Sequence, residues 1–223
     1  MKIKHKKITF HSTRTDLEIL RPTASTKQVP SWYRKMPLVR DKIQTIKKCV
    51  PFLDSLSMGY VIPLASDIYW DADEKIGKTN AKDSIYTDHV ASQTEDVIIP
   101  PEFDPQPHKW SNHWHIKTPK GYSTLFIHPL NRMDLPFYSL SGVVDTDSHP
   151  LIINFPFFIR KNFDGIIEAG TPMIQAIPFK RDSWSSEILD QFDSYRGDKD
   201  GHQVFEAPFG WYKRNHWSRK EYR

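Results

Sequence analysis

Strand and turn signals alternate along residues 118–181, and this stretch constrains the fold more than any other feature of the chain. Segments rich in β-branched, aromatic and other apolar residues recur there, separated by short runs of Gly, Pro, Asn and Asp. The turns follow one another at roughly ten-residue spacing, which is typical of an antiparallel sandwich or barrel and not of βαβ units. The segments predicted as strands are 122–127, 140–144, 151–159, 166–167 and 173–179.

The rest of the chain is predicted to complete a single mostly-β domain, an antiparallel β-sandwich or jelly roll with one or two helices. Residues 1–21 contain a short alternating segment that is expected to form an edge strand or arm. Apolar spacing predicts one helix at 41–49, ended by Pro51, and another that begins near Asp182. Seventeen prolines against nine glycines favour short strands and ordered loops. The further strands are predicted at 59–64, 66–70 and, as a pair, 84–99.

Composition excludes several classes of protein. No apolar run approaches the roughly 18 residues that a membrane span needs. The basic N-terminal segment lacks the apolar stretch of a signal peptide, and Cys49 is the only cysteine, so no intramolecular disulfide framework exists. Both features are expected of a cytoplasmic protein. The net charge of +4 is compatible with an anionic ligand.

Three short motifs resemble the dUTPase and dCTP-deaminase superfamily. They are TPKGY at 118–122, GVVDTD at 142–147 and GTPMIQAI at 170–177. The resemblance implies a β-clip fold, a homotrimer with sites shared between subunits, and a nucleoside triphosphate ligand with Mg²⁺. The pieces CVPFLDSLSMGY, TPKGYSTLF, GVVDTD and GTPMIQAIPFKR also resemble a family of uncharacterised bacteriophage proteins. That second resemblance implies a phage-encoded protein that acts in the host cytoplasm.

The dUTPase resemblance assigns roles to particular residues. Asp145 matches the aspartate that activates the attacking water, a task that suits a carboxylate. The opposing interpretation is that Asp145 and Asp147 only cap a tight hairpin. The residues that the resemblance makes ligand-binding are Lys120, Gly121, Arg132, Asp147 and Gln175.

Other parts of the family pattern are missing. The stretch at 128–132 reads HPLNR, which keeps Arg132 as a phosphate ligand but lacks the serine that should follow the arginine. Residues 148–150 read SHP instead of Tyr-Arg-Gly, and APFGW at 207–211 is a poor substitute for a glycine-rich phosphate arm. Asp54 with Gly59-Tyr60 only loosely matches the first family motif. We therefore expect nucleotide binding or sequestration rather than turnover.

Two alternatives remain open at the level of sequence. A structural or assembly protein of a virion is equally compatible with a sandwich and proline-rich loops. A cupin-like metal enzyme would use the histidines of the chain, but the acidic residue expected a few positions after His115 is absent, so we predict no metal site. The histidines concerned are His113, His115, His128 and His149.

Two segments interleave aromatic and basic residues. One is PSWYRKMP at 30–37, which is expected to pack against an edge of the core. The other is WYKRNHWSRKEYR at 211–223, the end of an arm that we assign to 205–223. Such a composition suits single-stranded nucleic acid or a partner subunit, and we favour an arm that clasps a neighbouring copy in a homo-oligomer, most simply a trimer.

Overall fold

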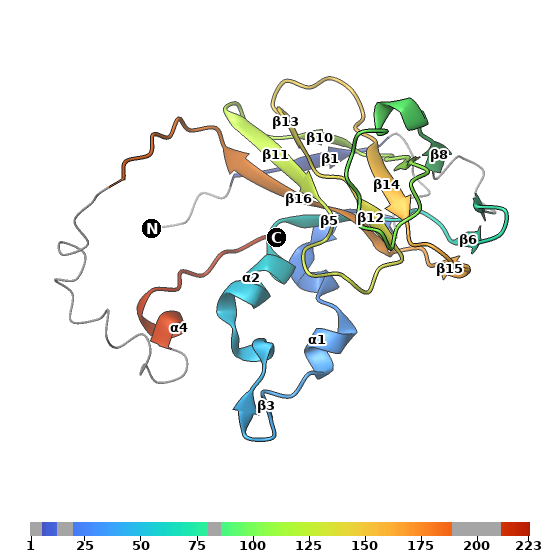
Figure 1. The fold of residues 1–223 in the computed structure, drawn as a ribbon. Helices are drawn as coiled ribbons and strands as arrows, with labels where there is room; N and C mark the ends of the chain where they lie inside the picture. The colour runs from blue at the N-terminus through green and yellow to red at the C-terminus, as the bar shows by residue number, and fades with distance from the viewer. Residues whose placement is uncertain (1–5, 13–19, 80–85, 189–210) are drawn as a thin grey trace.

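The protein is built almost entirely from antiparallel β-strands, as its computed structural model shows (Figure 1). The structure describes residues 6–12, 20–79, 86–188 and 211–223. Within these ranges the strand pairings are antiparallel and form five sheets. The mostly-β fold class predicted from the sequence is confirmed. No helix in the described ranges is long and apolar enough to cross a lipid bilayer.

The largest sheet has five strands in the order β13-β11-β16-β5-β2. Strand β16 lies at its centre, and its sequence PMIQAIPFK begins with five consecutive buried residues. Consecutive side chains of a strand point to opposite faces, so this run shows that both faces of the sheet are covered there. The strands are β2 (Thr23–Ala24), β5 (Tyr60–Pro63), β11 (Tyr122–Ile127), β13 (Gly142–Val144) and β16 (Pro172–Lys180).

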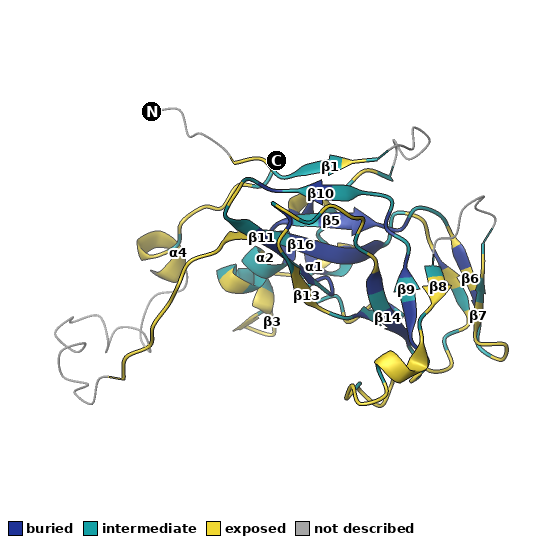
Figure 2. Ribbon diagram, turned by 90° about the horizontal axis from the view of Figure 1, so that it is seen from above, coloured by how far each residue is buried: buried dark blue, intermediate teal, exposed yellow. Residues whose placement is uncertain are grey.

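A second sheet, in the order β12-β14-β9-β8, packs against the first through aromatic side chains. The rings of Phe126 and Phe155 lie 5.1 Å apart and join β11 to β14. Trp110 stacks on Phe157 with ring centroids 3.5 Å apart. Figure 2 shows the buried residues gathered where the strands of these sheets lie. The strands are β8 (Tyr86–Asp88), β9 (His108–Trp110), β12 (Phe137–Ser139) and β14 (Phe155–Ile159).

Of the three smaller sheets, two extend this sandwich and the third, β3-β4, lies outside it. The sheet β15-β6-β7 adds Ile68, Trp70 and Ile167 to the same core, and the pair β1-β10 adds Ile116. Strand β1 lies within residues 1–21, the segment that is expected to form an edge strand or arm. The strands are β1 (Thr9–His11), β3 (Val39–Arg40), β4 (Ile43–Gln44), β6 (Ile68–Asp71), β7 (Ile76–Lys78), β10 (His115–Lys117) and β15 (Gly165–Ile167).

Residues 25–57 form a small lobe that projects from the sheets, with the β3-β4 hairpin at its tip (Figure 1). Its centre is a cluster of the rings of Trp32, Tyr33 and Phe52, in which Tyr33 and Phe52 stack at 5.8 Å. Tyr33 is buried, as expected if the aromatic segment 30–37 packs against a core edge. The lobe contains η2 (Ser25–Gln28), α1 (Ser31–Lys35), β3, β4, η3 (Ile46–Lys48) and α2 (Val50–Ser57).

The C-terminal segment folds back onto the base of this lobe. After helix α4 (Trp211–Asn215), the indole N–H of Trp217 donates to the Asp54 carboxylate at 2.9 Å, and the Lys220 ammonium donates to the same oxygen at 2.6 Å. The rings of Tyr222 and Tyr60 then meet edge to face at 6.0 Å. Within one copy, therefore, the described end of the aromatic-basic arm contacts α2 and β5.

The helix predicted at 41–49 is wrong. Asp41 and Lys42 have positive φ angles of 50° and 65° and form a two-residue hairpin turn between β3 and β4. Pro51 does not end a helix but lies in the first turn of α2, where its missing N–H has no helical partner to lose. Asp54 consequently lies on a helix and not on the strand that the first dUTPase motif requires.

Two further predictions at the level of secondary structure need correction. In 84–99 the described residues contain one strand, β8, followed by η4 (Ala91–Gln93) instead of a second strand. The helix predicted from Asp182 does not begin there, because residues 182–188 have no regular structure and Trp184 and Ile188 are 90% exposed. A helical stripe has no core to pack against at this point. The rest of that predicted helix lies outside the described residues.

Candidate functional site

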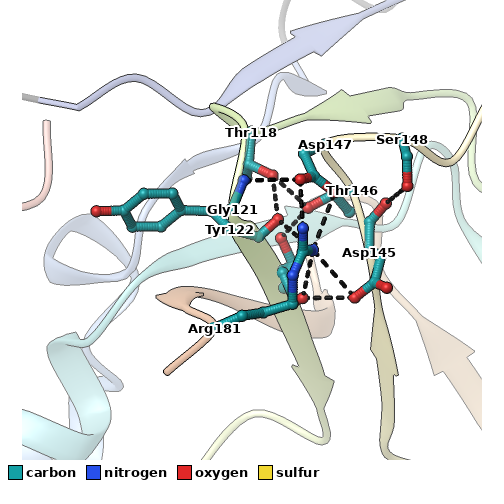
Figure 3. Close-up of polar contacts among 10 residues, drawn as sticks. Thr118, Gly121, Tyr122, Asp145, Thr146, Asp147, Ser148 and Arg181 are labelled. Atoms are coloured by element: carbon teal, nitrogen blue, oxygen red, sulfur yellow. Dashed lines mark hydrogen bonds and ion pairs between the residues drawn. The ribbon is translucent and has the colours of Figure 1, made fainter. Parts of the chain in front are cut away.

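Three neighbouring strands bring the dUTPase-like motifs to one edge of the five-stranded sheet (Figure 3). Gly121 precedes β11, Asp145 follows β13, and Arg181 follows β16. Strand β11 pairs with both of the others in antiparallel register, so its beginning lies beside their ends. Residues that are 60 positions apart in the sequence therefore meet. We call the group formed by Gly121, Ser123, Asp145, Asp147 and Arg181 the hairpin latch.

Asp147 is the most constrained member of the hairpin latch. Its carboxylate accepts hydrogen bonds from the Gly121 N–H at 2.8 Å and from both terminal nitrogens of Arg181, at 2.9 and 2.5 Å. The side chain is only 6% exposed. The hydrogen bonds from Arg181 and Gly121 hold the pKa of Asp147 far below its usual range, because they stabilise the charged form. Asp147 is thus a permanently ionised acceptor with its bonding capacity largely used.

Asp145 is more open. The Ser123 hydroxyl donates to its Oδ1 at 2.6 Å, and Arg181 lies 3.2 Å from the same oxygen, yet the side chain is 61% exposed. Its backbone carbonyl accepts the N–H groups of Ser148 and His149, at 3.0 and 2.9 Å, and so closes the turn. Asp145 therefore caps the hairpin, and its Oδ2 accepts no hydrogen bond from the part of the chain that the structure describes.

The turn is anchored from below by Thr146. This side chain is fully buried, and its hydroxyl exchanges hydrogen bonds with those of Thr118 and Thr124, at 2.7 and 2.8 Å. Three buried hydroxyls that satisfy one another rigidify the hairpin without leaving a polar group unpaired. The local sequence Asp-Thr-Asp thus places the Thr146 hydroxyl in the core between an exposed carboxylate, Asp145, and a largely shielded one, Asp147.

Charge determines what the hairpin latch can bind. Two carboxylates face a single guanidinium, so the group carries a net negative charge, and Arg181 is already engaged by both acids. A triphosphate would be repelled by the uncompensated carboxylate. Lys120 is exposed beside the latch, and among the described residues its side chain makes no hydrogen bond or ion pair with the latch. The geometry therefore favours a structural role, in which Arg181 attaches the end of β16 to the hairpin that contains Asp145 and Asp147, over an anion-binding site.

The other two residues assigned by the resemblance lie elsewhere. Arg132 forms a bidentate pair with Asp134, with both nitrogen–oxygen distances at 2.8 Å. Gln175 is 2% exposed; its amide accepts the Leu130 N–H at 2.9 Å and donates to the carbonyls of Ser55 and Met58. Gln175 thus ties helix α2 and the loop after β11 to the central sheet, and neither residue belongs to the hairpin latch.

The histidines of the cupin-like alternative do not assemble. Among the described residues no group of three His, Cys, Asp or Glu side chains is placed to hold a metal ion. His128 is buried; its Nδ1 accepts the Ser139 N–H at 3.3 Å and its Nε2 faces the Arg132 carbonyl at 3.2 Å. His113 precedes β10 instead of lying on it with His115, so the two do not form the strand pair that the alternative needs.

A groove lies between the lobe and the C-terminal segment. It has a volume of about 480 Å³, which is within the range of small-molecule sites. No carboxylate is found among its described lining residues, whereas Lys48, Lys213 and the ring of Tyr212 line it. We call it the lobe groove. Its lining consists of Gln44, Thr45, Ile46, Lys48, Cys49, Val50, Pro51, Tyr212 and Lys213.

No protein-family model matches the sequence, and no curated protein matches it either. The resemblances to dUTPases and to phage proteins therefore remain predictions that rest on the short motifs alone. The mostly-β fold is compatible with them and does not distinguish them from other sandwiches.

Several residues of these sites are not identified by sequence reasoning. Arg181 and Ser123 join the hairpin latch although none of the three dUTPase-like motifs includes them. The available signal is positional: Arg181 follows the last strand of the 118–181 stretch, at the edge where Asp145 and Asp147 also lie once the strands pair. The lobe groove has no such signal, because Tyr212 lies more than 160 positions from the lobe residues that it faces.

Proposed function

We propose that this protein binds a small anionic ligand with a planar group, such as a nucleotide, in the lobe groove, and does not turn it over. The supporting observation is the lining of the groove. Two lysines supply positive charge, the half-exposed ring of Tyr212 supplies a stacking surface, and apolar side chains supply the walls. A few polar groups on a mostly apolar wall are typical of ligand sites.

The chemistry of the two sites favours the groove over the hairpin latch. Lysine ammonium groups attract phosphate as point charges without needing a fixed geometry. A base can stack on Tyr212, and such stacking contributes about 1–3 kcal/mol for each base. In the hairpin latch, by contrast, the guanidinium is already paired with two carboxylates. Binding without turnover is expected because the described residues that line the groove include no carboxylate to activate a water.

The test is a titration of purified protein with dUTP, dCTP and ATP, with and without Mg²⁺, followed by calorimetry and thermal unfolding. At a ligand concentration 100-fold above Kd, binding adds about 2.7 kcal/mol of stability. For a chain of this size that raises the Tm by about 5–10 °C. We expect such a rise for at least one nucleotide.

Matched variants locate the site. Tyr212→Ala and Lys213→Glu should weaken binding at least tenfold, whereas Lys120→Glu and Asp145→Asn should leave it unchanged. The reverse pattern would place the ligand at the hairpin latch, as the motif resemblance implies. Absence of any nucleotide response in the unmodified protein would contradict ligand binding at either site.

A second candidate function, an assembly or structural protein, is favoured by a different observation. Several aliphatic side chains of the lobe are exposed to solvent instead of being buried in the core. Exposed apolar surface on a projecting element marks an interaction site in many proteins. The two candidates are compatible, since the exposed side chains of Leu38, Val39 and Ile43 are not among the lining residues of the groove.

A further inference from the structure

The β3-β4 hairpin carries an apolar face that nothing in the described chain covers. Ile43 is 73% exposed, Leu38 54% and Val39 46%. Arg40 pairs with Ile43 across the hairpin, and the Thr45 N–H donates to the Leu38 carbonyl. Since alternate positions share a face, Leu38 and Ile43 lie on one side together with the cation of Arg40. We call residues 38–45 the basic hairpin.

The basic hairpin is held rigidly even though each strand has only two residues. The Lys47 ammonium donates to the carbonyls of Arg34 and Met36, at 2.5 and 2.8 Å. The Tyr33 hydroxyl donates to the Lys47 carbonyl at 3.1 Å, and the Thr45 hydroxyl to the Pro37 carbonyl at 2.5 Å. Isolated two-stranded hairpins are marginally stable, so these bonds stabilise its base. A surface that is already ordered loses little conformational entropy on binding.

The charge around the basic hairpin is predominantly positive, with Asp41 at its tip between Arg40 and Lys42. Residues 31–53 contain six Lys or Arg residues and one Asp. Arg40 and Lys42, next to the exposed aliphatic side chains, take part in no ion pair within the described part of the chain. The surface is therefore complementary to one that is both acidic and apolar.

Such a surface exists on the same protein. Residues 86–108 contain five Asp or Glu residues and no Lys or Arg. Within them Ile98 is 98% exposed and Val90 60%, and the exposed residue Asp96 and its neighbour Glu95 lie between these two positions in the sequence. Backbone hydrogen bonds of 3.0, 2.9 and 3.0 Å order the turns from Val90 to Val97. We call residues 90–98 the acidic loop.

The two surfaces cannot meet within one copy. Figure 1 places the basic hairpin at the tip of the lobe and the segment around β8, which leads into the acidic loop, at the far side of the sandwich. Figure 2, viewed at right angles, also separates β3 from β8, and it shows both regions as exposed. The surfaces are therefore free to meet between copies.

We propose that the basic hairpin of one copy docks on the acidic loop of another, so that copies associate head to tail. Ile43 and Leu38 pack against Ile98 and Val90, while Arg40 and Lys42 face Glu95 and Asp96. A symmetric dimer through two basic hairpins is disfavoured, because it would place cations against cations. A contact between two different patches is heterologous, and it closes into a ring or continues as a filament. This inference rests on the second candidate function and is independent of ligand binding.

The test compares Ile43→Asp with Ile98→Asp by sedimentation velocity and light scattering. The unmodified protein should gain mass as its concentration rises, and each variant alone should remain monomeric. A mixture of the two should form a heterodimer and stop there, since one partner keeps an intact hairpin and the other an intact loop. Leu151→Asp, at a site 66% exposed and outside both surfaces, is the control and should assemble normally.

Charge provides a second, independent readout. Arg40→Glu with Lys42→Glu should abolish assembly, and so should Glu95→Lys with Asp96→Lys. A mixture of the two double variants should assemble again, because each hairpin then meets a loop of opposite charge on the other variant, and a combined variant carrying all four changes should assemble alone. Assembly of the unmodified protein should weaken as salt rises. A protein that stays monomeric at every concentration overturns the proposal, as does a mixture of Ile43→Asp and Ile98→Asp that fails to form heterodimers. Neither result bears on the nucleotide-induced rise in Tm.

Discussion

Among the residues of the dUTPase-like motifs, Gln175 is the one at which substitution best distinguishes a structural role from a ligand-binding role. The dUTPase resemblance makes it a ligand-binding residue, whereas its amide is engaged by three backbone groups, the Leu130 N–H and the carbonyls of Ser55 and Met58. The substitution Gln175→Leu keeps a side chain of similar size and removes all three hydrogen bonds.

The size of the effect follows from the partners left behind. Each buried polar group that loses its partner costs about 1–3 kcal/mol. The adjacent cavity of about 10 Å³ is at the lower limit for a single water, so rescue by solvent is small. Because the three groups are only partly shielded, we take values near the low end and expect a loss of about 3–5 kcal/mol. That corresponds to a fall in Tm of at least about 6 °C.

The assay is urea unfolding, combined with hydrogen exchange of the α2 amides. Gln175→Leu should lower the free energy of unfolding by the stated amount and speed exchange in α2, since Ser55 and Met58 attach that helix to the sheet. Gln93→Leu, at an exposed position of η4, is the matched control and should change stability by no more than about 0.5 kcal/mol. A loss below about 1 kcal/mol for Gln175→Leu, accompanied by loss of nucleotide binding, would refute the structural role.

Three further outcomes are expected. The pKa of Asp147 is lowered in the folded state, so the unfolded chain takes up a proton at this residue first as the pH falls. The difference in Tm between the unmodified protein and Asp147→Asn should therefore shrink between about pH 5 and pH 3. Burial lowers the pKa of His108, so stability should fall as pH drops below about 6.5, and His108→Phe should flatten that slope in thermal melts. Incubation with dUTP, dCTP and Mg²⁺ should yield no pyrophosphatase or deaminase product, and product that disappears in Asp145→Asn would contradict this.

The strands of the 118–181 stretch are predictable because two signals coincide there. Apolar runs of strand length alternate with Gly, Pro and Asp turns, and the structure forms β11 and β16 within these limits. The lobe is not predictable in this way. Ile43 and Ile46 are three apart, as in a helix, but Asp41 and Lys42 take up a left-handed turn that overrides the spacing. Over so short a segment, the geometry of the turn determines the structure, and the helical spacing of the apolar residues does not.

The candidate site is predictable only in part. Asp147 and Gly121 do meet, because their motifs lie on paired strands. Gln175, however, lies six residues before Arg181 along β16, about 20 Å at 3.3 Å per residue, so one copy cannot place it in the hairpin latch. Packing also explains why residue 59, in the loose match to the first dUTPase motif, is a glycine. Its φ is +68°, and a Cβ there would lie 2.3 Å from the Ala176 carbonyl oxygen. A short motif match cannot distinguish such packing from ligand contact.

The central position of β16 has a consequence for the order in which the protein folds. Its neighbours β5 and β11 are synthesised first, and each has an unsatisfied edge until β16 inserts between them. At about 5–20 residues per second, roughly 5–20 s of translation separate Pro63 from Pro172. During that interval two apolar strand edges are exposed on the nascent chain, which favours aggregation or chaperone binding. We expect chains truncated before Pro172 to be insoluble, and folding of the complete sheet to begin only after β16 has emerged from the ribosome.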